Sequence, residues 1–156
     1  MPFFVGEFKQ TIDAKHRMVI PMGLRERMDP EKDGKQFLLV LAEDGHLWLY
    51  PDKAYRRVLE RLDPSKLPDR EAGENRLVFA TARVVKPDKQ GRVVLPEESI
   101  ERGKLSPSVT LVGVFDHIEV WPRDEWEQHL AERLPEYGEV LARAAKKLRD
   151  RTTASE

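Results

Sequence analysis

The sequence predicts an α+β fold that is rich in β-strands and contains two tandem halves of the same design. Three observations predict it: a polar motif that occurs twice, a pair of apolar strands after each motif, and amphipathic helical stretches after each pair of strands. Each half of roughly 45 residues is too small to bury a core of its own. We therefore expect the two halves to pack against each other as one pseudo-two-fold unit.

The first repeated element is a short loop with the strand that follows it. Asp13–Pro21 (DAKHRMVIP) aligns with Asp88–Pro96 (DKQGRVVLP), so an aspartate, an arginine and a proline recur at a constant offset of 75 residues. Self-similarity at a fixed spacing indicates a duplicated unit. Each arginine opens a short apolar run that a proline stops, which predicts two short strands.

The second repeated element is a hairpin. Leu38–Pro51 (LLVLAEDGHLWLYP) aligns with Val109–Pro122 (VTLVGVFDHIEVWP) at an offset of 71 residues. The first half therefore holds four extra residues, which we place in the polar loop at 29–36. Two matches in the same order, with one consistent gap, indicate that the whole module is duplicated.

Hydrophobic periodicity predicts the same elements in each half. In the first half we expect a helical turn at 24–28 and strands at 5–12, 17–20, 37–41 and 46–50. In the second half we expect a helical turn at 97–102 and strands at 82–86, 92–95, 109–114 and 118–121. The Ala-Glu-Asp-Gly segment between the last two strands of the first half is a typical hairpin turn.

Each hairpin ends in an aromatic residue and a proline, Tyr50-Pro51 and Trp121-Pro122. These rings either stack on nucleic-acid bases or fix the corner between strand and helix, and we favour the corner because amphipathic helices follow. The first of these helices starts near Tyr55 and should break at Pro64. A linking helix is expected at 69–79.

The C-terminal region carries a longer apolar stripe at helical spacing, from Trp126 to Leu148. Pro135 should kink or split it. The stripe has two interpretations: it packs on the strands of its own chain, or it forms a subunit contact. Residues 152–156 are polar, and we expect a frayed tail there.

Composition excludes several classes of protein. The chain of 156 residues has 27 Lys and Arg against 28 Asp and Glu, and its net charge of −1 gives no global sign of a polyanionic partner. It has no cysteine, which excludes disulfides, thiolate catalysis and cysteine-based metal sites. No apolar run is long enough to span a membrane, and the N-terminal residues do not resemble a secretory signal. We expect a cytoplasmic protein.

The repeated Asp-x-x-x-Arg motif has a clear chemical use in a tight loop. The carboxylates of Asp13 and Asp88 can accept backbone N–H groups and pair with Arg17 and Arg92, which would hold each loop and orient each guanidinium group. A single pair of this kind more often only stabilises a turn than binds a ligand. Its duplication beside further cations favours binding.

Cations gather around both motifs. Phosphate neutralisation by such loops supplies affinity that does not depend on sequence, and arginine can read guanine edges. Many basic segments are only solvated surface, so the charge alone is weak evidence. The predicted DNA-binding residues are Lys9, Lys15, Arg17, Arg83, Lys86, Lys89 and Arg92, with Asp13 and Asp88 as motif partners.

The sequence does not predict an enzyme. The candidate catalytic histidines are His16, His46, His117 and His129, and no pair has a metal-binding spacing. His46 and His117 occupy equivalent hairpin positions, which a shared turn geometry explains better than one active site. The chain lacks nucleophile-elbow, dinucleotide-binding and phosphate-loop motifs. We expect no catalysis, no metal and no cofactor.

These repeated motifs resemble the MraZ family. Besides the two Asp-x-x-x-Arg motifs and the two hairpins, Gly6-Glu7-Phe8 and Ile118-Glu119-Val120-Trp121 match its pattern, and the resemblance covers roughly residues 3–150. It implies two SpoVT/AbrB-type domains of the swapped-hairpin β-barrel kind. It also implies a nucleoid-associated transcriptional regulator of the bacterial division and cell-wall gene cluster. Such a protein would bind short, G-rich direct repeats in its own promoter as a ring-shaped homo-oligomer.

The resemblance places domain 1 at 7–54, a helical linker at 55–82, domain 2 at 83–126 and a helical C-terminal region at 127–156. It assigns the motif arginines to Arg17 and Arg92, and Lys15 matches a family lysine. His16 departs from the family glycine, which the second half keeps at Gly91. The first loop therefore either has a different shape or gains a pH-sensitive donor toward phosphate. The alternative is a cytosolic self-assembling scaffold or protein-interaction module without specific DNA binding. Salt distinguishes the two, because DNA binding that contacts several phosphates must weaken steeply as the salt concentration rises.

Overall fold

The computed structural model describes residues 2–61 and 70–155, and it divides the chain into two compact units. The first unit, Met1–Arg123, contains all the strands that the structure describes, and the second, Asp124–Glu156, is helical. Tandem duplication has thus produced one compact strand-rich unit from two halves, because neither half buries a core alone.

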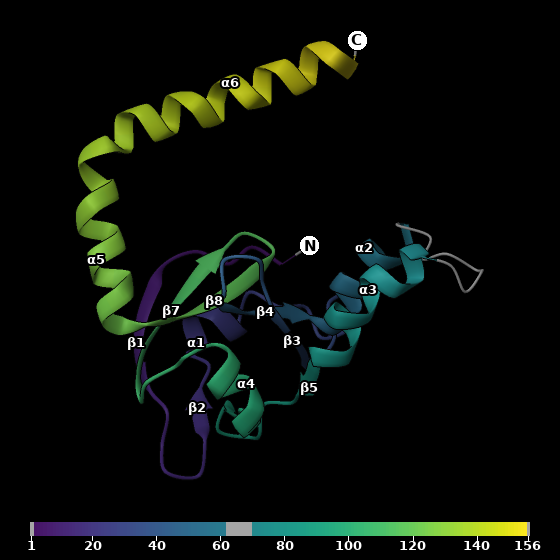
Figure 1. Cartoon of the computed structure of the whole chain (residues 1–156), viewed down its shortest axis with the longest axis vertical. Helices are drawn as coiled ribbons and strands as arrows, with labels where there is room; N and C mark the ends of the chain where they lie inside the picture. Colours follow the sequence, from purple (N-terminus) through teal and green to yellow (C-terminus); the bar gives the residue numbers. More distant parts are fainter. Residues whose placement is uncertain (1, 62–69, 156) are drawn as a thin grey trace. The chain divides into compact units, whose positions relative to one another are not determined.

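The first unit repeats one series of elements (Figure 1). The first half contains β1 (Glu7–Thr11), β2 (Arg17–Val19), α1 (Met22–Arg25), β3 (Phe37–Leu41), β4 (Leu47–Pro51) and α2 (Asp52–Arg61). The second half contains α3 (Arg70–Thr81), β5 (Arg83–Val85), β6 (Arg92–Val94), α4 (Glu97–Arg102), β7 (Ser108–Val114) and β8 (His117–Pro122). The expected strands are confirmed to within a few residues at their ends, and α4 and β3 have the expected bounds.

The two halves exchange their first strands. β1 of the first half pairs antiparallel with β7 of the second, and β5 of the second half pairs antiparallel with β3 of the first. The strand order of the large sheet is β1-β7-β8-β4-β3-β5, so the hairpins β3–β4 and β7–β8 form its centre. This is the swapped pairing that the resemblance implies.

The register shows the pseudo-two-fold relation directly. In the two-stranded ribbon, β2 pairs with β6, and Arg17 faces Val94 just as Val19 faces Arg92. Met18 and Val93 form the central pair of the ribbon. β4 and β8 pair in the same reciprocal way around a central pair in the large sheet. The offsets of 75 and 71 residues that the sequence shows therefore reappear as symmetry in space.

The expected closed barrel is not formed by the described residues. The strands make an open sheet of six and a separate ribbon of two. The reason is that the short edge strands β1 and β5 each pair on one side only, and β2 and β6 pair only with each other. The fold is α+β and strand-rich, as predicted.

One apolar core lies between the six-stranded sheet, the ribbon and the two short helices. It draws residues from both halves: Phe4, Ile12, Met18, Ile20, Leu24, Phe37, Leu39, Leu47, Leu49, Val85, Val93, Leu95, Val109, Leu111, Ile118 and Val120. Burying a side chain of this size stabilises the fold by roughly 1.5–3 kcal/mol. Because Met18 and Val93 belong to this core, the ribbon is held firmly against the sheet.

The second unit contains α5 (Arg123–Arg133) from its second residue on, a 3-10 turn η1 (Leu134–Glu136) and α6 (Tyr137–Ser155). Pro135 lies in the 3-10 turn and divides the two helices, as expected. The expected frayed tail is wrong for residues 152–155, because α6 continues to Ser155. Its threonines donate side-chain hydrogen bonds to carbonyls one turn back, which keeps them compatible with the helix.

Two further expectations differ in detail. The helical turn expected at 24–28 begins earlier, at Met22, because Pro21 supplies the extended conformation that precedes the helix. The helix expected after Tyr55 begins at Asp52. The predicted break at Pro64 lies outside the described residues.

Candidate nucleic-acid interface

Each motif folds into the same hydrogen-bonded loop. In the first, one carboxylate oxygen of Asp13 accepts the backbone N–H groups of Lys15 (2.9 Å) and Arg17 (2.8 Å). The other accepts Arg17 Nε at 2.7 Å. The aspartate therefore fixes both the turn and the arginine that follows it. We call this arrangement the clamp loop.

The second clamp loop repeats this geometry. Asp88 accepts the backbone N–H groups of Gln90 (2.8 Å) and Arg92 (3.0 Å), and its second oxygen accepts Arg92 Nε at 2.8 Å. The predicted pairing of aspartate and arginine is confirmed in both halves. Two copies of one loop, each with an oriented guanidinium group, are therefore present in the first unit.

The clamp loops favour the ionised carboxylates. The hydrogen bond from the backbone of Arg17 lowers the pKa of Asp13, together with its side chain and the N–H of Lys15. The corresponding bond from Arg92 lowers the pKa of Asp88. Both groups are negatively charged at neutral pH, so each arginine is held by a full opposite charge.

The ribbon turns its two arginines to the same outer face. Side chains alternate along a strand, and in β2 and β6 the central Met18 and Val93 point into the core. Arg17, Val19, Arg92 and Val94 consequently line the opposite face; the valines are 36% and 59% exposed.

The register makes Arg17 and Arg92 diagonal neighbours across the ribbon. Strand geometry places their Cα atoms roughly 8 Å apart. Their clamp loops lie at opposite ends of the ribbon, because the two strands run antiparallel and each loop precedes its strand. Each end of the outer face thus carries one clamp loop and the arginine that the loop orients, with Met18 and Val93 between them on the inner side.

The guanidinium groups keep their terminal N–H groups for another molecule. Nε of each arginine is bound to its aspartate, and the described part of the chain offers the Nη atoms of Arg17 and Arg92 no hydrogen-bond partner. These side chains are 34% and 33% exposed. Each is pre-oriented through one edge and available through the other, which suits bidentate contacts to phosphate or to guanine.

Each clamp loop is also tied to the other half. The carbonyl of His16 accepts the N–H of Leu95, and the carbonyl of Gly91 accepts the N–H of Ile20, both at 2.8 Å. His16 adopts φ +62° and Gly91 φ +80°. The expectation of a differently shaped first loop is wrong, because His16 accepts the left-handed conformation that the glycine adopts and the same hydrogen bonds form.

A family profile described as "MraZ protein, putative antitoxin-like" matches residues 3–77 and 78–147, one match for each clamp loop. The chain belongs to the MraZ family. A protein named "Transcriptional regulator MraZ" from Clostridium tetani is 30% identical over 145 residues, which cover 86% of this chain and 99% of the relative.

Further relatives carry the same name. The protein from Moorella thermoacetica is 33% identical over 142 residues, covering 89% of this chain and 94% of the relative. The protein from Heliobacterium modesticaldum is 33% identical over 139 residues, covering 88% and 93%. These relatives are named regulators, which is not an enzyme class.

In this member of the MraZ family, the structure adds a residue that sequence reasoning missed. The Arg25 guanidinium lies over Gly91: a Cβ atom placed on the glycine would meet Arg25 Cζ and Nε at 2.5 Å. Arg25 Nε also donates to the carbonyl of Ile20 at 2.7 Å. The equivalent residue of the other half is Ile100, which lines a surface pocket beside His16. The two clamp loops therefore have different neighbours.

The remaining predicted cations are spread over the first unit. Lys15 and Lys89 are exposed in the two clamp loops. Lys9 and Arg83 lie on β1 and β5, which are opposite edges of the six-stranded sheet, so they do not join the ribbon. Lys86 is exposed between β5 and the second loop.

Arg83 is occupied within the first unit. It donates to Glu98 at 2.8 Å and to the carbonyls of Ala80 and Ala82. A structural role in holding β5 to α4 accounts for these contacts. Arg83 is therefore the weakest of the predicted DNA-binding residues.

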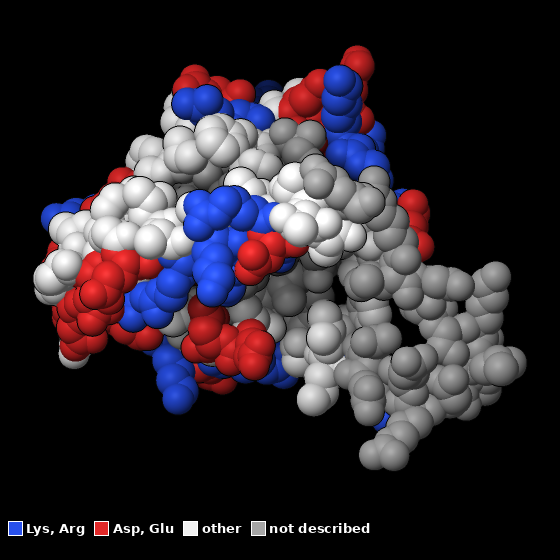
Figure 2. Space-filling view, turned by 90° about the horizontal axis from the view of Figure 1, so that it is seen from above, with Lys and Arg blue, Asp and Glu red and all other residues white. Residues whose placement is uncertain are grey.

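On the face that Figure 2 shows, Lys and Arg lie beside Asp and Glu. This agrees with the net charge of −1. The case for a nucleic-acid interface consequently rests on the geometry of the ribbon, not on bulk charge. The described residues contain no helix with the length and apolarity of a membrane span, and no group of three His, Asp or Glu side chains suited to a metal ion.

The paired histidines belong to an aromatic layer on the other face of the six-stranded sheet. His46 stacks on Trp121 with ring centroids 3.8 Å apart, and His117 stacks on Trp48 at 3.9 Å. His117 is buried, and its two ring nitrogens contact Asp116 at 2.7 Å and Glu119 at 2.8 Å. These contacts are those of packed, internally bonded groups.

Burial lowers the pKa of His117, but the hydrogen bonds and charges of its two carboxylate neighbours outweigh that effect, so its pKa is raised. The ring is thus stabilised in its protonated form. Because both ring nitrogens already contact carboxylates, His117 has a structural role and is not a free acid or base.

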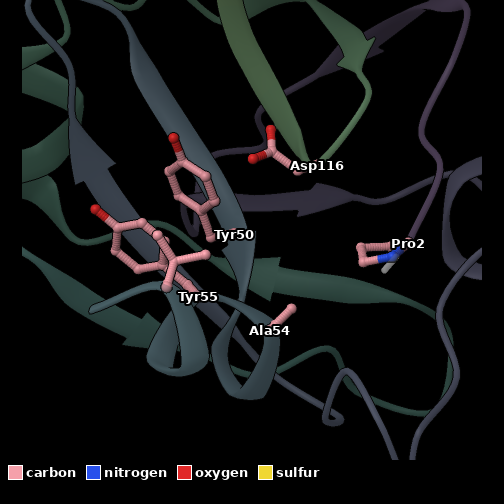
Figure 3. Close-up of a pocket in the computed structure, with 6 residues that line it drawn as sticks. Pro2, Tyr50, Ala54, Tyr55 and Asp116 are labelled. Atoms are coloured by element: carbon pink, nitrogen blue, oxygen red, sulfur yellow. The ribbon is translucent and has the colours of Figure 1, made fainter. Parts of the chain in front are cut away.

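The aromatic corner of the first half packs as expected. Tyr50 and Tyr55 stack with centroids 4.1 Å apart, and they border a small pocket of about 100 Å³ with Pro2, Ala54 and Asp116 (Figure 3). Burial and then the charge of Asp116 raise the pKa of Tyr50. The two rings stack on each other, so they fix the corner between β4 and α2.

Proposed function

We propose that this chain is a transcriptional regulator that binds double-stranded DNA through the outer face of the β2–β6 ribbon. The observation that carries the proposal is the duplicated clamp: two aspartates orient Arg17 and Arg92 on one exposed ribbon and leave their terminal N–H groups unbound. The names of the relatives support the role in transcription.

The shape of the ribbon supports entry into the major groove, which admits a two-stranded β-ribbon. There Arg17 and Arg92 are placed to donate two hydrogen bonds each to guanine O6 and N7, while Val19 and Val94 offer apolar contact to thymine methyl groups. The clamp loops at the two ends of the ribbon would carry Lys15 and Lys89 to the phosphates. Lys9, Arg83 and Lys86 lie outside the ribbon, so we assign them only contacts to the DNA backbone at the edge of the interface.

A single ribbon makes few contacts, so we propose that several chains act together as a homo-oligomeric ring on direct repeats in the chain's own promoter. Joined modules raise affinity without a new contact, because the later binding events are intramolecular. Because the affinity then comes from several joined chains, each chain can bind DNA with a net charge of −1. The gene cluster proposed as the target is that of division and cell wall, and the proposed location is the cytoplasm and nucleoid.

The test is a fluorescence-anisotropy titration with the duplex upstream of the chain's own gene, at two salt concentrations. Arg17→Ala and Arg92→Ala should each weaken binding by about 10- to 100-fold, corresponding to roughly 1–3 kcal/mol for one bidentate base contact. Arg56→Ala, an exposed arginine of α2, is the matched control and should bind like the parent chain. A scrambled duplex tests for specificity.

Three results decide between the proposals. If Arg17→Ala and Arg92→Ala both lose binding to the promoter duplex, and the parent chain does not bind the scrambled duplex, the result supports a specific regulator. Equal binding to both duplexes reduces the function to non-specific association with DNA. Absence of binding at either salt refutes the proposal and leaves the self-assembling scaffold as the better description.

His16 allows a further test of the same interface. If it donates to phosphate when protonated, DNA affinity should change between about pH 6 and pH 8 more steeply than in His16→Gly. Identical pH profiles would remove His16 from the interface while leaving the arginines in place.

A further inference from the structure

The helix α6 presents an exposed apolar stripe. Every residue from 141 to 154 is exposed, in a helix of 19 residues. Tyr137, Leu141 and Leu148 recur at intervals of four and seven, which aligns them on one face of α6, and they are 59%, 56% and 67% exposed. A long helix gains most of its stability from packing such a face against a partner.

The charges of α6 are arranged around this stripe. At about 100° per residue, Arg149 lies on one flank of the stripe and Lys147 and Arg151 lie on the other. The two acids, Glu139 and Asp150, fall on the opposite side of the helix. The docking face of α6 is therefore apolar in its centre and basic at its edges.

The helix α5 shows the complementary pattern. Trp126 and Leu130 share one face, Glu127 lies on one flank, and Glu125 and Glu132 lie on the other by the same helical spacing. Over its length, four acids oppose two arginines in α5, whereas five basic residues oppose two acids in α6. One helix of this unit is thus net negative by two and the other net positive by three.

An apolar groove lies in the elbow between these helices. It has a volume of about 420 Å³ and is lined by Trp126, His129, Leu130, Arg133, Leu134, Tyr137 and Val140. Its walls come from the acidic helix, the 3-10 turn and the first turn of α6. The lining is mostly apolar, and its Arg133 is paired with Glu136 at 3.2 Å. The acids of α5 lie on either side of this lining, where they can meet the basic edges of an apolar helix face.

We propose that the docking face of α6, centred on Leu148, binds in the elbow groove of a second chain. The occupant is a second chain because the opposite charges are carried by two helices of the same unit. Pairing α6 with another α6 would set basic edges against basic edges. This inference rests on the proposed homo-oligomeric assembly and not on the contact with DNA.

The contact joins two different surfaces, so it is head-to-tail. Such a contact leaves a free groove on one end of a pair and a free α6 on the other, and it propagates until a ring closes. Dimers with a two-fold axis through this contact are not formed. The second unit therefore supplies the assembly, and the first unit remains available for DNA.

The test measures the mass of the full-length chain in DNA-free solution by light scattering coupled to gel filtration. Leu148→Glu should convert the assembly to monomers, because a carboxylate would be buried in an apolar groove. Leu134→Glu, in the groove, should do the same. Both positions are exposed, so helical circular dichroism should be unchanged. Lys146→Gln is the matched control: it removes the same unit of charge on the side of α6 away from the stripe and should leave the assembly intact.

Mixing the two defective variants distinguishes a head-to-tail contact from a symmetric one. Leu148→Glu keeps a sound groove and Leu134→Glu keeps a sound Leu148 face, so the mixture should form dimers with one repaired junction. A mixture that stays monomeric refutes the head-to-tail contact. An assembly that survives Leu148→Glu refutes this interface, and a monomeric parent chain refutes the assembly itself, while DNA binding by the ribbon is decided separately by Arg17→Ala.

Discussion

Replacing Gly91 with alanine should destabilise the chain for two separable reasons. Gly91 has φ +80°, where an alanine costs about 1–2 kcal/mol. Its new Cβ would meet the Arg25 guanidinium at 2.5 Å. Because that group is the end of a flexible side chain, it would swing away and lose its 2.7 Å bond to the carbonyl of Ile20.

The magnitude follows from these two parts. A hydrogen bond to a charged group contributes about 1.5–3 kcal/mol, and the more restricted unfolded chain returns about 0.4–1 kcal/mol. We expect Gly91→Ala to lower the free energy of unfolding by about 2–4 kcal/mol. Gly45→Ala isolates the backbone part, because Gly45 has φ +86° and no atom within 4 Å of a new Cβ. It should cost about 1 kcal/mol.

The assay is urea denaturation followed by tryptophan fluorescence, at one protein concentration for all variants. In an Arg25→Ala background, Gly91→Ala should cost no more than Gly45→Ala does, because the guanidinium is already absent. Equal costs for Gly91→Ala and Gly45→Ala in the parent chain would refute the role assigned to Arg25.

Three further predictions concern packing, pH and salt. Gly113→Ala should lower the free energy of unfolding by about 3 kcal/mol, because its Cβ would lie 2.6 Å from the backbone nitrogen of Val5, and an unchanged melting temperature would contradict this. The raised pKa of His117 means that its contribution to stability is complete below about pH 6.5 and is lost as pH rises through the folded pKa. His117→Asn should flatten the dependence of the urea midpoint on pH in that window, and a parallel profile would show that another group titrates. Lys89→Ala should weaken binding to all duplexes alike and reduce the salt slope by about 1, whereas a change for the promoter duplex alone would assign Lys89 to base readout.

Much of the fold followed from local pattern. The repeat placed Phe37–Leu41 and Glu97–Arg102 at their observed bounds, because strand alternation, prolines and turn residues act over a few neighbours. The clamp loops were also predictable, since Asp13 and Arg17 are four residues apart and Asp88 and Arg92 repeat the spacing. Such short-range hydrogen bonds can be predicted without knowing the tertiary structure.

The rest depended on distant contacts. Periodicity does not show that β1 pairs with β7, about a hundred residues away, and this pairing came only with the family resemblance. Arg25 was invisible as a neighbour of the second clamp loop, because the two segments meet only through packing; Gly91, which permits a close approach, was the only signal. The sequence did not show that Arg83 is paired with Glu98, because this ion pair joins β5 to α4. Arg83 was therefore assigned to DNA.

The fusion of two halves into one chain has a consequence for the kind of site that the ribbon matches. A dimer of identical chains presents the same surface in both directions and is suited to an inverted repeat. Here the halves have diverged, with His16 beside Ile100 at one end of the ribbon and Gly91 under Arg25 at the other. The two ends of the ribbon are therefore chemically different, and such a surface matches a DNA site whose two ends also differ. Chains set in one orientation along a duplex repeat that polarity, which is the arrangement of a direct repeat.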